Sequence, residues 1–476
     1  MLCRQFLAVT ILTLQATIAQ ADPIDLSSRC FPGTARAVTI HLEFGGDLIA
    51  LSQQENSTDS ASEQTESQQV PVEVAAHIEY DEVALPLNGD IQRSARFYSK
   101  VDATINVGGK KTTPIFRDSR RLVVAEIDDQ CKRLLAINGP LDRNEFETLD
   151  LWSDSLALDA LLPDSPMAIG GTWKHDEKAM IGFTGLESLD VCEVSSVLIE
   201  ANDRYARCKL AGTVHGVSHG ARVELDLDAN YLVDCQAGCI EKLNLAVRDE
   251  RAIGPARPGL SGVVKLRFES ALRKELHGIT EPMIARVLGA LPTLAPVVQT
   301  RSDSLGFAVA HDLAWYGAGT HRDMMTLRRV EGDRLIAHGT IAKLPAKSID
   351  PERALADFRR DTVTTIGESM TNLISDEQWT NQHGCWVMGV VAEGEVSGVP
   401  IEWHTYLVAS PEESPATHRM ALTFTVEKSD LKRLAKRDRE LVDKIELIPA
   451  TGHRETAGRL KSSNQASGLE RGVGRR

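Results

Sequence analysis

Hydrophobic and polar residues alternate along several stretches of the first 270 residues, with the period of two expected of a strand that has one buried face. In residues 36–50 the apolar positions are Val38, Ile40, Leu42 and Phe44. The same pattern predicts strands at residues 70–80, 97–107, 122–127, 194–199, 204–214, 221–231, 240–247 and 262–268. Short turns join most of these segments, so the first part of the chain is predicted to be a curved antiparallel meander.

Residues 384–410 alternate in the same way and predict a long β-hairpin with its turn at Ser397 and Gly398. The second arm has an apolar face of Ile401, Trp403, Thr405 and Leu407 and a polar face of Glu402, His404 and Tyr406. We expect the face of Trp403 to pack on helices in the core. The opposite face is expected to be a packed or solvated sheet face, with a ligand groove beneath a helix as the alternative.

Longer apolar repeats indicate helices at residues 142–163, 280–291, 351–366 and 431–448. The first covers one face of the meander, and Pro163 ends it. The last two accompany strands at residues 306–311, 323–330, 334–344 and 419–426. Two helices on an antiparallel sheet predict an α+β sandwich for the last third of the chain.

The last third also resembles a known fold. The G-x3-G-x-P-I-x-W-x-x-Y run at residues 394–406, the strand HRMALTFTVEK from His418 and the order of the helices are similar to the PsbP-like fold over residues 305–448. That resemblance implies an antiparallel sheet between helices, as in photosystem-associated lumenal proteins, and implies no catalytic residue. Residues 30–270 look similar to secreted bacterial proteins with a small-residue loop, a tryptophan and a meander, which implies no activity.

The N-terminal residues predict an exported protein. Arg4 precedes a short apolar run at residues 6–14, and small residues follow at Ala19 and Ala21, as in a signal peptide cleaved after Ala21. No later segment is long and apolar enough to be a transmembrane helix. We therefore expect a periplasmic or secreted protein with a β-rich domain at residues 22–290, an α+β domain at 300–449 and a disordered basic tail at 450–476. Residues 52–69 lack large apolar side chains and are predicted to form a disordered loop.

The cysteines indicate which disulfides can form, and the net charge indicates which partners are not expected. The chain has eight cysteines, of which Cys3 belongs to the predicted signal peptide. In an oxidising compartment the others can form disulfides, and we expect Cys235 to pair with Cys239 across a hairpin loop and Cys192 to pair with Cys208. Since 53 basic and 67 acidic residues give a net charge of −14, nucleic acid is not an expected partner.

Three sets of residues are weak candidates for chemistry. His215 and His219 have the spacing H-x3-H of a metal pair, but no third ligand lies near them, so a surface turn is the simpler interpretation and no metal or cofactor is expected. Asp226 and Asp228 share one face of a strand, where a solvated face is the simpler interpretation. Glu402, His404 and Tyr406 are candidates for lining a ligand groove.

No nucleophile or metal motif is evident, and a catalytic function is therefore not expected. The first hypothesis is a non-catalytic binding or assembly module that docks a protein partner. The second is a carrier that holds an apolar small molecule in the curved sheet of the first domain, and the third is a hydrolase without a recognisable motif. A filled core in the first domain favours the docking module, whereas an apolar cavity of several hundred cubic ångströms favours the carrier.

Overall fold

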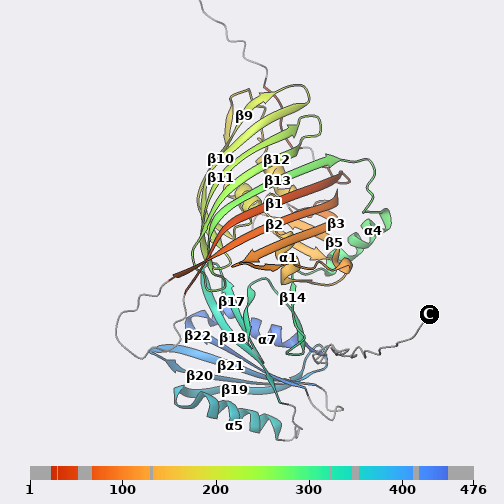
Figure 1. Ribbon diagram of the computed structural model, residues 1–476. Coiled ribbons are helices and arrows are strands. Elements are labelled where there is room, and N and C mark those ends of the chain that lie inside the picture. Colours follow the sequence, from red (N-terminus) through yellow and green to blue (C-terminus); the bar gives the residue numbers. More distant parts are fainter. Residues whose placement is uncertain are drawn as a thin grey trace, which may run out of the picture.

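The structure is a computed structural model that describes residues 23–28, 31–51, 67–89, 91–128, 132–321, 323–345, 353–410 and 418–448. The strands of these residues form sheets of twelve, seven and four strands. In Figure 1 the twelve-stranded sheet is a curved layer above the seven-stranded sheet. The predicted signal peptide and the predicted disordered tail lie outside the described residues, as does most of the predicted loop at 52–69.

The twelve-stranded sheet is antiparallel, with the order β6-β5-β3-β2-β1-β13-β12-β11-β10-β9-β8 and with β4 beside β3. Its strands are β1 (Ala35–Leu51), β2 (Ser67–Ala84), β3 (Gln92–Val107), β4 (Lys110–Thr112), β5 (Leu122–Ile127), β6 (Lys132–Ala136), β8 (Thr172–Lys174), β9 (Ser188–Ala201), β10 (Tyr205–Ser218), β11 (Ala221–Asp234), β12 (Cys239–Arg251) and β13 (Gly259–Leu272). Residues 67–69 are paired with β1, so the loop predicted at 52–69 ends earlier than expected.

The alternation in the sequence explains these strands. In β11 every second side chain from Ala221 to Val233 is buried, and the side chains between them, such as Glu224 and Asp226, are exposed. The inward side chains of the sheet belong to one large hydrophobic cluster that also includes Phe146, Leu158 and Phe183 from helices. The concave face of the sheet therefore encloses the core.

The helix predicted at residues 142–163 is broken into α1 (Arg143–Leu149), α2 (Ser155–Leu158) and a 3₁₀ turn, η2 (Asp159–Leu161). Asp142 and Glu145 form a capping box at the start of α1. Ser153 has φ 58°, outside the helical range, and Asp154 caps the next helix through the backbone N–H of Leu156. The remaining short helical elements in the first half of the chain are η1 (Asp118–Arg120) and α3 (Glu177–Thr184).

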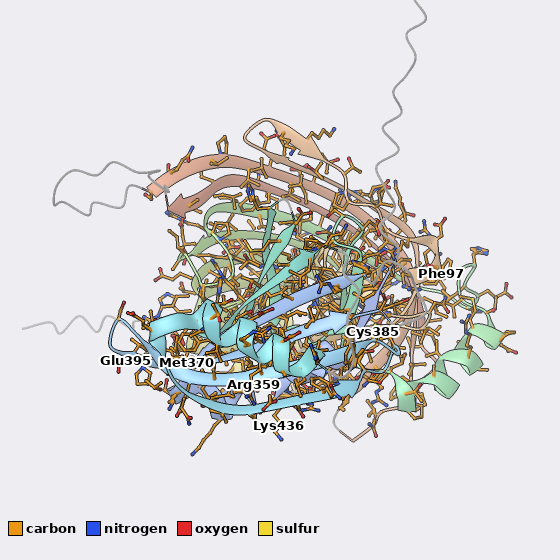
Figure 2. All side chains as sticks on the ribbon, turned by 90° about the horizontal axis from the view of Figure 1, so that it is seen from below. Phe97, Arg359, Met370, Cys385, Glu395 and Lys436 are labelled. Atoms are coloured by element: carbon orange, nitrogen blue, oxygen red, sulfur yellow. The ribbon has the colours of Figure 1, made fainter. Side chains whose placement is uncertain are left out.

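The seven-stranded sheet is antiparallel, with the order β16-β17-β18-β22-β21-β20-β19. Its strands are β16 (Trp315–His321), β17 (Met324–Glu331), β18 (Arg334–Leu344), β19 (Met370–Thr380), β20 (Trp386–Val396), β21 (Val399–Ala409) and β22 (Arg419–Glu427). The helix α5 (Ala354–Ile366) and the turn η4 (Gly367–Ser369) lie on one face. Figure 2 is drawn from that side and shows α5 lying across the sheet.

The predicted α+β sandwich of the PsbP-like type is wrong, because the protein is mostly β and the second helix of the sandwich does not form. Residues 431–448 instead contain α6 (Leu431–Leu434), α7 (Arg437–Asp443) and β23 (Ile445–Leu447), after the turn η5 (Lys428–Asp430). Ala435 and Lys436 have φ 46° and 65°, in the left-handed region, which ends the helix after one turn.

The predicted hairpin is present, and Ile401 and Leu407 are buried as expected, but Trp403 does not fill the centre of the core and the opposite face is buried as well. Ser397 and Gly398 both have positive φ, and Val396 pairs with Val399, as in a two-residue loop. Tyr406 is 4% exposed and belongs to the main hydrophobic cluster of this sheet, with α6 and α7. Trp403 is only partly buried and faces α5.

A four-stranded sheet joins the two larger sheets, with the order β23-β15-β14-β7. It contains β7 (Leu141–Asp142), β14 (Val298–Ser302), β15 (Phe307–His311) and β23. Between β13 and β14 the chain forms α4 (Glu281–Ala290) and η3 (Leu291–Thr293), and Val287 of α4 packs in a cluster with Ala95, Leu122 and Val124.

Candidate functional site

The concave face of the twelve-stranded sheet is filled at one end and hollow at the other. Val38, Ile40 and Ile78 are at most 4% exposed where helices cover them. Further along β1, Leu42 and Phe44 are only half-buried, and they line a cavity of about 380 Å³. We call this space the concave cavity.

The walls of the concave cavity are mainly apolar. Aliphatic and aromatic side chains come from β1, β2, β13 and the link between α1 and α2, namely Leu42, Phe44, Leu48, Val72, Val74, Leu151, Trp152, Leu260 and Val264. Opposite β1, Gly262 leaves room for the ring of Phe44, because a Cβ at Gly262 would lie 2.6 Å from Phe44 Cζ. A volume of this size and lining lies within the range of small-molecule pockets in proteins.

The floor of the concave cavity is the link between α1 and α2, residues 150–154. Lys132 of β6 holds this link, since its Nζ lies 2.7 Å from Asp150 Oδ1 and donates to the carbonyl oxygen of Leu151 at 2.8 Å. Arg96 of β3 forms a bidentate ion pair with Asp154, at 2.8 Å and 2.5 Å. These contacts fix Leu151 and Trp152 against the cavity.

The Arg96 ion pair belongs to a buried polar network beneath the floor. Ser155 donates to Glu82, and Tyr80 donates to Ser155 at 3.1 Å. Burial raises the pKa of Asp154, but the charges of Arg96 and Lys132 outweigh burial and hold that pKa well below its usual range. Asp154 is therefore ionised, and its charge is compensated inside the protein.

Charged side chains lie at the rim of the concave cavity. Arg251 of β12 donates to both carboxylate oxygens of Asp249, and Arg257 donates to Glu147 of α1. His219, in the turn between β10 and β11, lines the same rim. Burial lowers the pKa of His219 to about 3, with the positive charges of Arg257, Arg251 and Arg143 acting in the same direction, so this imidazole is neutral at pH 7.

A second cavity, of about 310 Å³, lies between the twelve-stranded and seven-stranded sheets. His219 and Asp150 line both this cavity and the concave cavity, so they separate the two. The Nδ1 atom of His219 lies 2.9 Å from the hydroxyl of Tyr316 on β16. Its walls combine charged side chains, such as Lys132 and Arg143, with apolar ones, such as Phe146 and Leu313.

The weak metal candidates His215 and His219 do not come together as a site. His215 is in β10 opposite Glu224, whereas the ring of His219 packs edge-on against Tyr316. Among the residues that the structure describes, no group of three or more His, Cys, Asp or Glu side chains is placed to hold a metal ion. His219 instead lines the two cavities.

The candidates Glu402, His404 and Tyr406 do come together, around a residue that the sequence analysis did not select. Asp438 of α7 is 1% exposed, and its Oδ2 atom lies 2.6 Å from His404 Nδ1 and accepts from the Tyr406 hydroxyl at 2.5 Å. The Nε2 atom of His404 lies 3.1 Å from Glu402 Oε2. The four side chains form a continuous polar chain between β21 and α7.

The protonation of this chain follows from its contacts. Burial lowers the pKa of His404, but Asp438 and Glu402 raise it by more, so its pKa lies above the usual value. Burial raises the pKa of Asp438, but hydrogen bonding to His404 outweighs burial and lowers it. A His404 cation lies between two carboxylates on this sheet face and compensates the charge of Asp438, although Asp438 Oδ1 has no hydrogen-bond partner among the described residues.

The predicted disulfides do not form among the five cysteines that the structure describes. Cys192 is opposite Val214 and Cys208 is opposite Leu198, which separates the two cysteines by six residues along the strands, or about 20 Å. Cys239 is opposite Asp234 rather than Cys235, because the loop is one residue longer than predicted. Asp226 and Asp228 lie on the solvated face, as expected, and Asp228 pairs with Lys209 at 3.0 Å.

The sequence matches no protein-family model and no curated protein. Among solved structures, a Bacteroides thetaiotaomicron protein is 13% identical over 31% of this chain and 47% of its own, with a TM-score of 0.21. Lipovitellin is 8% identical over 53% of this chain and 26% of its own, with a TM-score of 0.29. The immunity protein TplEi of Pseudomonas aeruginosa, in complex with a peptide, is 10% identical over 52% of this chain and 97% of its own, with a TM-score of 0.19.

This chain thus spans about half the length of the first of these proteins and about a quarter of the second. TM-scores of this size do not establish a shared fold, so the site stands on its own geometry. The described part of the chain contains no helix with the length and hydropathy of a membrane span.

His219 lies in a turn, the simpler interpretation of its sequence context, but the sequence did not indicate that it lines a cavity or which other residues do so. Leu42 and Phe44 were recognised only as members of a buried strand face, since alternation does not show where a face is left uncovered. The conspicuous local signal was the Gly45-Gly46 pair next to them, because glycine within a strand often marks a close approach of another chain segment.

Proposed function

We propose that this protein is an extracytoplasmic, non-catalytic binding protein that carries a small apolar or amphipathic molecule in the concave cavity. The observation that supports this proposal is the apolar space of about 380 Å³ at the hollow end of the curved sheet. Of the hypotheses drawn from the sequence, this space favours the carrier over the docking module. Export rests on the predicted signal peptide and is part of the proposal.

The physical reason is the free energy of burial. Leu42, Phe44 and Trp152 present apolar surface to the cavity, and an apolar ligand that removes this surface from water gains about 25 cal/mol per Å². The adjoining cavity beside His219, with Lys132 and Arg143 in its lining, offers a place for the polar group of an amphipathic molecule. The ion pairs beneath the floor keep the walls in position before the ligand arrives, which lowers the cost of binding.

The test is a fluorescence titration of the purified mature protein with N-phenyl-1-naphthylamine, an uncharged probe that brightens in apolar surroundings. Val264 lines the cavity and Val263 is 46% exposed on the opposite face of the same strand. We expect Val264→Trp to fill the cavity and weaken probe binding at least tenfold. The matched control Val263→Trp should bind as the wild type does.

Equal binding by the two variants, or no saturable binding by the wild type, would contradict the proposal. Circular dichroism and thermal unfolding of both variants are needed alongside, because a tryptophan that does not fit the cavity can also destabilise the fold. Native mass spectrometry of protein purified from its own cells then identifies any molecule that stays bound.

A further inference from the structure

A third cavity, of about 770 Å³, lies between α5 and the outer face of the seven-stranded sheet. We call it the α5 groove. The helix packs against β19 and β20, whereas the neighbouring strands β21 and β22 supply much of the floor of the groove. In Figure 2, α5 crosses this sheet on the side away from the twelve-stranded sheet, so the α5 groove is separate from the concave cavity.

The two ends of the α5 groove differ in chemistry. At the N-terminal end of α5, Ala354 and Phe358 pack with Met388 and Leu407 in a small apolar cluster that closes the groove. At the C-terminal end the lining is rich in hydroxyl groups, with Thr362 and Thr365 on the helix and Thr405, Thr423 and Thr425 on the sheet. Trp403 lies among these threonines and is partly exposed to the groove.

The threonines of the sheet are in register with one another. Thr405 is opposite Thr423, Thr423 is opposite Thr340, and Thr340 is opposite Thr326, so four adjacent strands carry one row of hydroxyl groups on the same face. Neighbouring members are about 4.8 Å apart between strands. Only Thr405 and Thr423 of this row line the groove, and Thr340 and Thr326 lie beyond it.

Thr365 donates to the carbonyl oxygen of Asp361 at 2.8 Å, whereas the hydroxyl of Thr362 is buried without such a bond to a described residue. Thr362 is 6% exposed, and its Oγ1 has no hydrogen-bond partner among the described residues. An apolar ligand at this end would remove threonine hydroxyls from water without replacing their hydrogen bonds, which is unfavourable. A ligand with several hydroxyl groups of its own would replace those bonds.

The charges of the described residues in the groove disfavour an anion as the natural ligand. Asp357 and Asp361 project from α5, and among the described lining residues the one basic side chain is that of Arg419, which already donates to the carbonyl oxygen of Pro345 at 2.7 Å and 3.1 Å. A carboxylate such as Asp361 accepts hydrogen bonds from neighbouring hydroxyls. An indole face such as that of Trp403 packs against the C–H face of a pyranose ring.

We propose that the α5 groove is a binding site for a short neutral oligosaccharide, with one sugar ring on Trp403 and the sugar hydroxyls on Thr405, Thr423 and Asp361. The site is independent of the apolar ligand proposed for the concave cavity. It would give the protein a second ligand class, on the opposite side of the seven-stranded sheet.

The test is isothermal titration of the mature protein with maltotriose, cellotriose and N,N′,N″-triacetylchitotriose. We expect saturable binding of at least one of the three. Trp403→Ala should weaken it at least tenfold, and the double variant Thr405→Val, Thr423→Val, which removes two hydroxyls at nearly constant volume, should do the same. The matched control Thr340→Val changes the same row outside the groove and should bind within twofold of the wild type.

Absence of binding by the wild-type protein with all three sugars would overturn the proposal. So would an equal loss in Thr340→Val, since the effect would then come from the sheet and not from the groove. Titrations with choline and with decanoate test an organic cation and an apolar anion, and tight binding of either in place of the sugars would also overturn it. The thermal unfolding midpoint of each variant shows that the fold is retained.

Discussion

Arg96 and Asp154 form a bidentate ion pair in the interior of the curved sheet, with distances of 2.8 Å and 2.5 Å and side-chain exposures of 2% and 4%. The pair joins β3 to the link that forms the floor of the concave cavity. Two buried charges stabilise a fold only as long as both are present, because each compensates the desolvation of the other.

Replacement of Arg96 by methionine should therefore be strongly destabilising. It would remove the cation beside Glu82 and leave Asp154 with Lys132 at 3.8 Å, and we expect a loss of about 3–5 kcal/mol in the free energy of unfolding, measured by urea denaturation. Arg267→Met is the control, because its pair with Glu269 is exposed and should contribute less than about 1 kcal/mol. Similar losses in the two variants would show that the buried pair has no special role.

The orientation of the hairpin predicts unequal effects for two aromatic residues. Tyr406 is buried and bonded to Asp438, so Tyr406→Ala should cost about 3–5 kcal/mol in unfolding free energy. Trp403 is half-buried over the α5 groove, and Trp403→Ala should cost less than about 2 kcal/mol. The reverse order would restore the assignment made from the sequence alone.

The contribution of His404 to stability should depend on pH. Its pKa is raised above the unfolded value near 6.5, so its contribution is complete below about pH 6.5 and is lost as the pH rises through the folded-state pKa. The difference in unfolding free energy between the wild type and His404→Gln should therefore shrink from pH 5.5 to pH 9. The lowered pKa of Asp438 keeps that carboxylate ionised over this whole range.

Two other histidines, His175 and His311, affect the pH dependence of stability in the opposite direction from His404. Burial is the main cause that lowers the pKa of His175 and His311 to about 4, so they reduce stability as the pH falls from 6.5 towards 4. Both are present in the wild type and in His404→Gln, and their effects cancel in the difference. A difference that grows with pH would contradict the arrangement around Asp438.

Cys208 should be unreactive in the folded protein. It is fully buried, and burial is the main cause that raises its pKa to about 12, so almost no thiolate is present at pH 8. Peptide mapping after treatment with iodoacetamide should find Cys208 unmodified in buffer and modified in urea. Modification of the native protein would show that this part of the sheet opens readily.

Strand alternation allowed much of the fold to be predicted. The predicted strand at residues 334–344 coincides with β18, and β11 follows its pattern residue by residue. The helices predicted at residues 142–163 and 431–448 are broken into shorter elements, for reasons that lie outside the local sequence. Ala435 and Lys436 are good helix formers, yet both are left-handed here, which lets β23 reach β15.

The two faces of the hairpin show a second limit of prediction from the sequence. When both faces of a strand are partly apolar, the sequence does not reveal which of them packs against the main hydrophobic cluster. The sequence left open whether the face of His404 and Glu402 is packed, solvated or part of a groove, because it does not show that Asp438 supplies the partner that makes their burial possible. The concave cavity was anticipated only as an alternative, because it depends on how far α1 and α2 extend along the sheet.

The four-stranded sheet places residues from distant parts of the chain side by side. Leu141 pairs with Val298, and Val309 pairs with Ile445, so each of these contacts joins residues well over one hundred positions apart in the sequence. Such long-range pairing slows folding, because a large loop must close before the contact forms. Synthesis must therefore pass Leu447 before this sheet can be completed, and a fragment that stops before β23 would leave β15 with an open edge.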